Sequence, residues 1–262
     1  MKISIIGAGN MGSAVALGIA NALPENTVAV SNPSVEKLKS LEQINPTIET
    51  TTSNVEAATG ASVLIFAVKP WILPGVIKEL RQCIEREMPI IVSMAGGIDL
   101  DNIEDMIGEG CRPATFYTIP NTAALVGESM TFISCRRADE TQISVVCRLF
   151  EACGKVAVVE ERLMSAATAL SSCGIAYAYK YVQACVQAGV QMGFRPDDAL
   201  QYTIATVAGA MSMLKTNCTK PQEEIDRVTT PGGMTIRGVN SLEDTGFMSS
   251  VINAVITPLK KQ

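Results

Sequence analysis

A glycine-rich turn near the start of the chain is the feature that most constrains the fold. Residues 2–6 predict a buried strand and residues 13–22 predict a helix, and the connection between them reads Gly7-Ala8-Gly9-Asn10-Met11-Gly12. In such a unit the first glycine permits the turn, the second lets backbone amides approach a pyrophosphate, and the third lets the helix pack close to the strand. We therefore expect a dinucleotide site at the positive end of this helix. The alternative is a structural turn that binds no ligand.

Short apolar or β-branched segments alternate with helical segments over the first 160 residues. Strands are predicted over residues 2–6, 27–30, 63–68, 90–94, 114–118, 131–134 and 156–159. Residues 72–86 and 140–150 show the clearest periodicity of amphipathic helices that cross between strands. This alternation predicts an α/β fold over residues 1–160, a Rossmann-like, doubly wound and mainly parallel sheet.

The remaining residues, 161–262, show helical patterns without strand patterns. Helices are predicted over residues 176–191, 197–214, 223–228 and 235–260, with breaks at Gly193, Pro196, Pro221, Pro231 and Gly246. The first two are apolar around most of their circumference, and a small monomeric domain cannot bury such helices. We therefore expect an all-helical dimerisation domain and a homodimer, with a higher homo-oligomer left open. A membrane span is disfavoured, because the uncharged stretches are shorter than the roughly 20 residues needed to cross a bilayer.

The composition excludes several classes of function. The net charge of −5 comes with no basic face, so neither DNA nor RNA is expected as a partner. The eight cysteines form no C-x-x-C pair, which argues against a metal site and for reduced thiols. Because the chain opens on a strand and shows no export signal, we expect it in the cytoplasm. The absence of histidine excludes Ser-His-Asp hydrolysis and histidine-based alcohol oxidation.

The end of the second predicted strand indicates which dinucleotide is preferred. A site for NAD usually places an acid there, on the ribose diol, whereas this chain has Ser31, Asn32 and Ser34. Lys37, one turn into the next helix, adds positive charge that suits a 2′-phosphate. These residues favour NADPH, with NADH as the alternative. They are also ordinary residues for a helix start followed by a solvated lysine.

Two further motifs carry a resemblance to a known family. Ala67-Val68-Lys69-Pro70 and the segment TTPGGMT, residues 229–235, resemble those of the pyrroline-5-carboxylate reductase family. Matching segments in the same order are Ala95-Gly96-Gly97, Pro120-Asn121-Thr122, residues 170–177, Ala188-Gly189-Val190, and Gly209-Ala210 with Met213-Leu214. The resemblance implies NAD(P)H-dependent reduction of a small molecule, 1-pyrroline-5-carboxylate, to L-proline, the last step of proline biosynthesis. Such a reaction needs no histidine, because the hydride quenches the positive charge of an iminium.

The resemblance and the glycine turn together assign candidate site residues. Thr235 is the catalytic candidate, and the substrate-binding candidates are Ser172, Gly232, Gly233, Met234 and Thr235. The cofactor-binding candidates are Gly7, Gly9, Asn10, Met11, Gly12, Ser31, Asn32, Asn54, Ala67, Val68, Lys69, Pro70, Ala95 and Asn121. From the residues alone, Pro231-Gly232-Gly233 forms an anion nest at a helix start, where a carboxylate fits. The alternatives are a helix capped by Thr230 or Thr235, a solvated Lys69, and Asn121 as a residue bonding its own turn.

Departures from the family keep other functions open. The family's Gly-Pro-Ala-Tyr loop reads Ser172-Cys173-Gly174-Ile175-Ala176-Tyr177 here, its His-Pro reads Lys220-Pro221, and Ala123 replaces a proline. A second cyclic imine as substrate is therefore an alternative. A β-hydroxyacid dehydrogenase would use Lys180 on the first long helix of the second domain, but Ala184 stands where that family usually has Asn. A dinucleotide-binding paralogue without catalysis is the third alternative.

Overall fold

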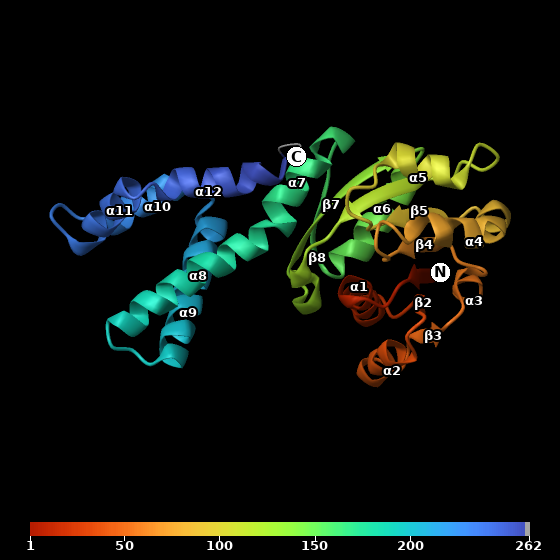
Figure 1. The fold of residues 1–262 in the computed structure, drawn as a ribbon, viewed down its shortest axis with the longest axis horizontal. Coiled ribbons are helices and arrows are strands. Elements are labelled where there is room, and N and C mark those ends of the chain that lie inside the picture. The colour runs from red at the N-terminus through yellow and green to blue at the C-terminus, as the bar shows by residue number, and fades with distance from the viewer. Residues whose placement is uncertain (260–262) are drawn as a thin grey trace. The chain divides into compact units, whose positions relative to one another are not determined.

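The computed structural model describes residues 1–259 (Figure 1). Its internal contacts divide the chain into two compact units, Met1–Ser172 and a second unit that begins at Cys173. The sequence places the domain boundary after residue 160, where the strand patterns end. The contacts continue the first unit to Ser172 because the short helix α7 (Met164–Ala167) and the π-helical turn Thr168–Ser172 pack on it. Met164 joins its apolar core, and the Ser172 hydroxyl donates to the Pro120 carbonyl at 3.2 Å.

An eight-stranded sheet forms the centre of the first unit, in the order β3-β2-β1-β4-β5-β6-β7-β8. The strands are β1 (Lys2–Ile6), β2 (Thr27–Ser31), β3 (Glu49–Thr51), β4 (Val63–Phe66), β5 (Ile90–Ser93), β6 (Thr115–Ile119), β7 (Ser129–Arg136) and β8 (Gly154–Val158). All neighbours are parallel except β6 and β7. The doubly wound, mainly parallel fold is confirmed. The strand β3 was not predicted, because its three polar residues carry no apolar pattern.

Helices cover both faces of this sheet (Figure 1). They are α1 (Asn10–Ala22), α2 (Val35–Ile44), α3 (Asn54–Ala58), α4 (Leu73–Glu87), α5 (Leu100–Ile107) and α6 (Glu140–Glu151). Successive strand residues point to opposite faces, so that Ile5 packs in the cluster with α1 and α6, while Ile6 packs in the cluster with α4 and α5. Helices on both faces explain why β4 is apolar at every position and why β1 carries isoleucines on both of its faces.

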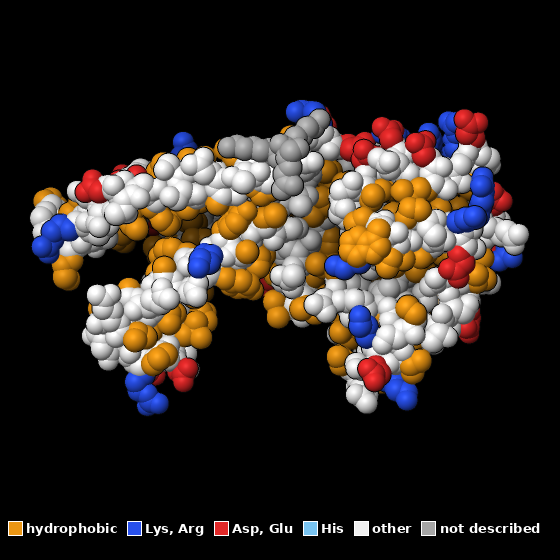
Figure 2. Space-filling view, viewed as in Figure 1, with side chains coloured by type: hydrophobic (Ala, Val, Ile, Leu, Met, Phe, Trp, Pro, Cys, Tyr) orange, Lys and Arg blue, Asp and Glu red, His pale blue; other side chains and the backbone are white. Residues whose placement is uncertain are grey.

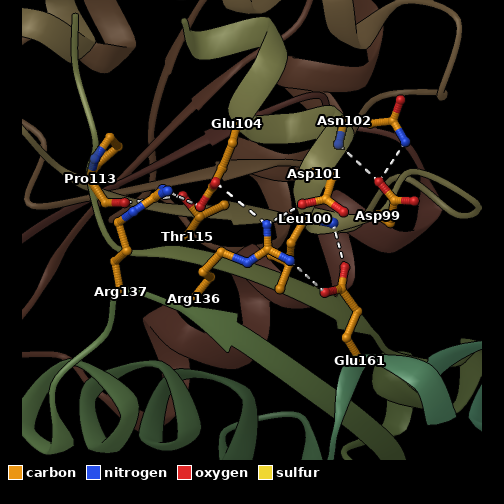
Figure 3. A network of polar contacts seen from close by, with 10 residues as sticks. All are labelled: Asp99, Leu100, Asp101, Asn102, Glu104, Pro113, Thr115, Arg136, Arg137 and Glu161. Carbon is orange, nitrogen blue, oxygen red and sulfur yellow. Dashed lines mark hydrogen bonds and ion pairs between the residues drawn. The ribbon is translucent and has the colours of Figure 1, made fainter. Parts of the chain in front are cut away.

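An ion-pair network holds the end of the sheet where the chain leaves β8 (Figure 3). The Arg136 guanidinium, at the end of β7, contacts Asp101, Glu104 at 3.5 Å and Glu161 at 3.0 Å. The Glu161 carboxylate in turn accepts the backbone amide of Leu100 at 2.7 Å. Because one arginine joins α5 to the segment after β8, the network fixes the path of the chain at this corner.

The second unit is helical throughout its described part, which ends at residue 259. Its helices are α8 (Gly174–Gln191), α9 (Pro196–Asn217), α10 (Pro221–Val228), α11 (Met234–Asp244) and α12 (Phe247–Ile256). α8 and α9 pack closely at Gly189, where a Cβ would lie 2.8 Å from that of Ala199. Gly246, at φ +75°, divides the region predicted as one helix over residues 235–260 into α11 and α12. Lys260, the last residue of that prediction, lies outside the described residues.

Many large apolar side chains of the second unit are exposed, and Figure 2 shows them over its helices. They include Tyr179 and Tyr181 on α8, and Tyr202, Ile204 and Met211 on α9. Within residues 1–259, none of the helices combines the length and the apolar character that a bilayer crossing requires. All eight cysteines are free thiols, and the exposed one is Cys218, at the end of α9. The second unit therefore presents apolar helix surface that its own residues leave uncovered.

Candidate functional site

A cleft of about 820 Å³ opens at the carboxyl ends of the first parallel strands. Ligands of open α/β sheets bind in this position, outside the strand ends where the strand order reverses. Ten of the predicted cofactor residues line it: Gly7, Gly9, Asn10, Met11, Asn32, Asn54, Ala67, Val68, Lys69 and Pro70. The structure therefore brings together, in one cleft, four segments that are separate in the sequence.

The glycine turn is shaped by close backbone approach. Gly7 has φ +112°, its amide donates to the Ser31 carbonyl at 2.8 Å, and a Cβ there would lie 2.7 Å from the Ala67 carbonyl oxygen. A Cβ on Gly12 would overlap the Gly7 carbonyl oxygen. Gly9 precedes α1, has no atom within 4 Å of its missing Cβ, and gives α1 no side-chain cap. The first amides of α1 thus meet open space, as an anion-binding helix start requires.

The polar edge of the cleft is arranged by side-chain hydrogen bonds. The Asn32 side-chain oxygen accepts the Ala8 amide at 3.1 Å, which ties the end of β2 to the glycine turn. The Ser31 hydroxyl donates to the Asn54 side-chain oxygen at 2.7 Å, and the Asn54 amide donates to Glu79 at 2.8 Å. Among the described residues that line the cleft, Lys37 and Lys69 are charged and no acid is present. The cleft lining therefore carries positive side-chain charge, which suits a phosphorylated ligand.

Four predicted cofactor residues lie outside this lining. Gly12 and Ser31 are buried beneath the cleft, and Ala95 is buried between Met94 and Gly96, which do line it. Asn121 is buried, with its side chain accepting the Ala123 amide at 3.0 Å and donating to the Ser171 hydroxyl at 3.0 Å. These bonds match the interpretation of Asn121 as a turn residue, so its contact with the nicotinamide stays a prediction.

The segment after Ala95 is held by a buried phenol. The Gly97 amide donates to the Tyr117 hydroxyl at 3.0 Å. Burial raises the pKa of Tyr117 above its ordinary value, so the phenol stays neutral and keeps its proton at neutral pH. Tyr117 therefore orients the border of the cleft and supplies no acid near pH 7.

Sequence reasoning missed the apolar wall of the cleft. Trp71, Ile72 and Val76 line it after the Val68-Lys69-Pro70 motif, and Thr52 lines it after the end of β3. The signal was available in part, because these residues follow the ends of β3 and β4 as the predicted residues do. Ile72 and Val76 also lie within residues 72–86, which were predicted only as an amphipathic helix, and Val76 packs in the apolar core as well.

The predicted substrate segment lies in the second unit. The Gly233 amide donates to the Thr230 carbonyl at 2.9 Å, and Gly232 has φ +72°, so Thr230-Pro231-Gly232-Gly233 is a turn that requires glycine at its third position. Gly233 precedes α11 and no side chain caps the helix, which excludes the alternative of a cap by Thr230 or Thr235. Thr235 stands exposed on the first turn of α11. This helix start therefore offers free amides beside a hydroxyl.

Comparisons with known proteins find similar proteins for both parts of the chain. Residues 161–262 match the family model described as pyrroline-5-carboxylate reductase dimerisation, and residues 2–97 match the model described as NADP oxidoreductase, coenzyme F420-dependent. Pyrroline-5-carboxylate reductase from Methanosarcina acetivorans is 36% identical over 97% of this chain and 94% of its own length. The chain belongs to the pyrroline-5-carboxylate reductase family.

Solved structures of this family share the fold. Pyrroline carboxylate reductase from Plasmodium falciparum, solved with NADP bound, has a TM-score of 0.87 and 30% identity, covering 98% of this chain and 95% of its own. Pyrroline-5-carboxylate reductase from Coxiella burnetii has a TM-score of 0.90 and 28% identity over the same shares. The cofactor cleft and the all-helical second unit thus both have counterparts in the family.

Family membership also decides between the alternatives for Lys180. That side chain is exposed on α8 and donates to Gln183 at 2.8 Å, which is typical of a surface lysine. A β-hydroxyacid dehydrogenase therefore finds no support in its placement. Among residues 1–259, no group of three or more metal-ligating side chains comes together, so no metal ligands are assigned in that part of the chain.

Proposed function

We infer that this chain reduces 1-pyrroline-5-carboxylate to L-proline with a nicotinamide cofactor held in the cleft. The observation that carries this function is the open start of α1 above the glycine turn, in a chain that its family relatives match along nearly their whole length. The chain is a pyrroline-5-carboxylate reductase, an NAD(P)H-dependent oxidoreductase of proline biosynthesis. When bound, the cofactor supplies the hydride that reaches the ring carbon of the imine.

The residues of this chain are proposed to bind and orient both molecules. The free amides at the starts of α1 and α11 bind the cofactor pyrophosphate and the substrate carboxylate, respectively. The Thr235 hydroxyl hydrogen-bonds the ring nitrogen, which takes its proton from water before the hydride arrives. The chain needs no histidine for this, because the hydride converts a cationic C=N bond into a neutral amine without building an oxyanion.

Turnover with purified protein tests the function directly. We expect NADPH to be oxidised in equal amount to the proline formed when 1-pyrroline-5-carboxylate is added. Binding of NADPH without oxidation would instead favour a paralogue without catalysis. Oxidation of NADPH with another cyclic imine alone would indicate that the departures from the family at Cys173, Ile175 and Lys220 change which substrate is bound. A 3-hydroxy acid with NADP⁺ serves as the substrate control and is expected to give no turnover.

NADPH is proposed as the preferred cofactor, because Lys37 lines the cleft beside Asn32 and no acid does so within the described residues. The variant Lys37→Ala should raise KM for NADPH about fivefold and leave KM for NADH unchanged, since a single exposed phosphate contact contributes about 1 kcal/mol. Steady-state kinetics with each cofactor measure the effect. The control is Lys39→Ala, which removes the same charge from α2 outside the cleft. Equal loss with both cofactors would contradict the phosphate contact.

A homodimer is proposed through the exposed apolar helices of the second unit, in the cytoplasm where free thiols persist. Light scattering should give a mass at least twice the 27.8 kDa of the chain. Ile204→Lys on α9, at a side chain 53% exposed, should shift the mass towards the monomer. Leu125→Lys, at a comparable 60% exposed in the first unit, is the matched control. A monomer in the unchanged protein would contradict the proposal.

A further inference from the structure

Trp71 combines wide exposure with a fixed backbone. It is the only tryptophan of the chain, it lines the cofactor cleft, and it is 76% exposed. It lies in the turn between β4 and α4, where the Lys69 carbonyl accepts the amides of Ile72 at 2.9 Å and Leu73 at 3.3 Å. The residue before Trp71 is Pro70, whose ring restricts its own φ angle. An indole that faces water from a rigid turn is ready to receive a flat ligand at small entropic cost.

The surroundings of Trp71 define one part of the cleft. Its lining combines apolar side chains at Trp71, Ile72 and Val76 with polar ones at Thr52 and Asn54, which follow the end of β3. The bond of 2.8 Å between Asn54 and Glu79 ties α3 to α4, the helix that carries Val76. Such a pairing of an apolar wall with hydrogen-bonding groups suits a nucleoside, whose base is flat and apolar on its faces and whose ribose is polar.

The position of this part relative to the glycine turn fits the adenosine half of a dinucleotide. The turn binds the pyrophosphate above β1, and Asn32, Pro33 and Lys37 extend the lining over the end of β2. Met94 and Gly96, just after the end of β5, line the part of the cleft towards which the nicotinamide half would extend. Trp71 is the only aromatic residue among the described residues that line the cleft.

We propose that the Trp71 indole stacks on the adenine ring of the bound cofactor and is the main apolar determinant of affinity for its adenosine half. This inference rests on the proposed cofactor site. Offset stacking on an aromatic side chain is favourable for any base, because every base has a π-face, and Trp71 is widely exposed to solvent in the free protein.

Binding measurements with cofactor fragments test the stacking. Trp71→Ala should raise Kd about tenfold for NADPH and by the same factor for adenosine 2′,5′-bisphosphate. Trp71→Phe, which keeps an aromatic face, should stay within about threefold of the unchanged protein. Ile44→Ala, at an apolar side chain 68% exposed on α2 and outside the cleft, is the control and should change neither Kd. The turnover of reduced nicotinamide mononucleotide, which lacks adenine, should be the same in all four proteins.

Fluorescence gives an independent readout, because a single tryptophan means that all indole emission reports on this position. NADPH should quench the emission and produce nicotinamide emission by energy transfer. Unchanged indole emission together with equal Kd values for Trp71→Ala and the unchanged protein would overturn the stacking while leaving the cofactor site intact. If Trp71→Ala also lost turnover with reduced nicotinamide mononucleotide in the same proportion, the stacking would be overturned too, because the effect of the variant would then be structural. Absence of any NADPH binding would instead contradict the proposed function itself.

Discussion

Thr235→Val should lower kcat for 1-pyrroline-5-carboxylate about 10- to 100-fold, because it removes one hydrogen bond to a charged ring nitrogen. Valine keeps the branched shape of threonine, and Thr235 is exposed on the first turn of α11, so the helix should tolerate the change. Kd for NADPH should stay within about twofold, since the proposed contact is with the substrate alone. Steady-state kinetics and cofactor titration separate the two quantities.

The same helix supplies the control for this variant. The Thr245 hydroxyl follows α11 and donates to the Ser241 carbonyl at 2.9 Å, so Thr245→Val makes the same chemical change at the other end of the helix. It should leave kcat unchanged. Equal losses of kcat in both variants would show that hydroxyl removal perturbs α11 itself, and loss of NADPH affinity in Thr235→Val would refute the assignment to the substrate.

Two alanine variants of the glycine turn should separate stability from cofactor affinity, since one should lower the free energy of unfolding and the other should weaken NADPH binding. In Gly12→Ala the new Cβ overlaps the Gly7 carbonyl oxygen and lies 2.9 Å from the Ala67 Cβ, and backbone of a buried turn cannot move aside. Overpacking of this kind lowers the free energy of unfolding by about 1–3 kcal/mol. In Gly9→Ala the Cβ meets no atom within 4 Å and φ is −77°, so the free energy of unfolding should change by less than about 0.5 kcal/mol. The Cβ nevertheless occupies the approach of the pyrophosphate, and Kd for NADPH should rise at least about tenfold.

Thermal denaturation without cofactor and NADPH titration together check this contrast. Gly12→Ala should lower Tm by several degrees, roughly 2–4 °C per kcal/mol for a domain of this size. Gly9→Ala should keep the Tm of the unchanged protein in the absence of NADPH and lose most of the rise in Tm that NADPH produces. Retained NADPH affinity in Gly9→Ala would mean that no phosphate approaches Gly9, which would contradict the proposed position of the cofactor.

Much of the fold follows from local patterns in the sequence. The strand β4 was predictable because both faces of the sheet are covered, so that all four of its residues are apolar. The turn at Gly7 and the turn at Gly232 were predictable because each needs a positive φ that glycine adopts freely. Ten cofactor candidates fell into one cleft because parallel strands end at one edge of the sheet.

Other parts of the site depend on tertiary contacts that no local pattern records. The bond from Asn54 to Glu79 joins residues 25 positions apart, and it forms because α3 and α4 are neighbours in the folded unit. Asn121 lies away from the cleft lining because Ser171, 50 positions later, accepts its side-chain amide. Trp71 escaped notice because an exposed tryptophan in a turn fits no periodicity. Long-range pairing thus decided which of several plausible roles each residue has.

The chain carries one tryptophan in the first unit and one exposed cysteine in the second. An acceptor dye attached to Cys218 would form an energy-transfer pair with Trp71, since the other seven thiols are less accessible. No residue would have to be replaced to make this distance measurement. The native sequence therefore lets the separation of the two units be measured in the cofactor-free protein.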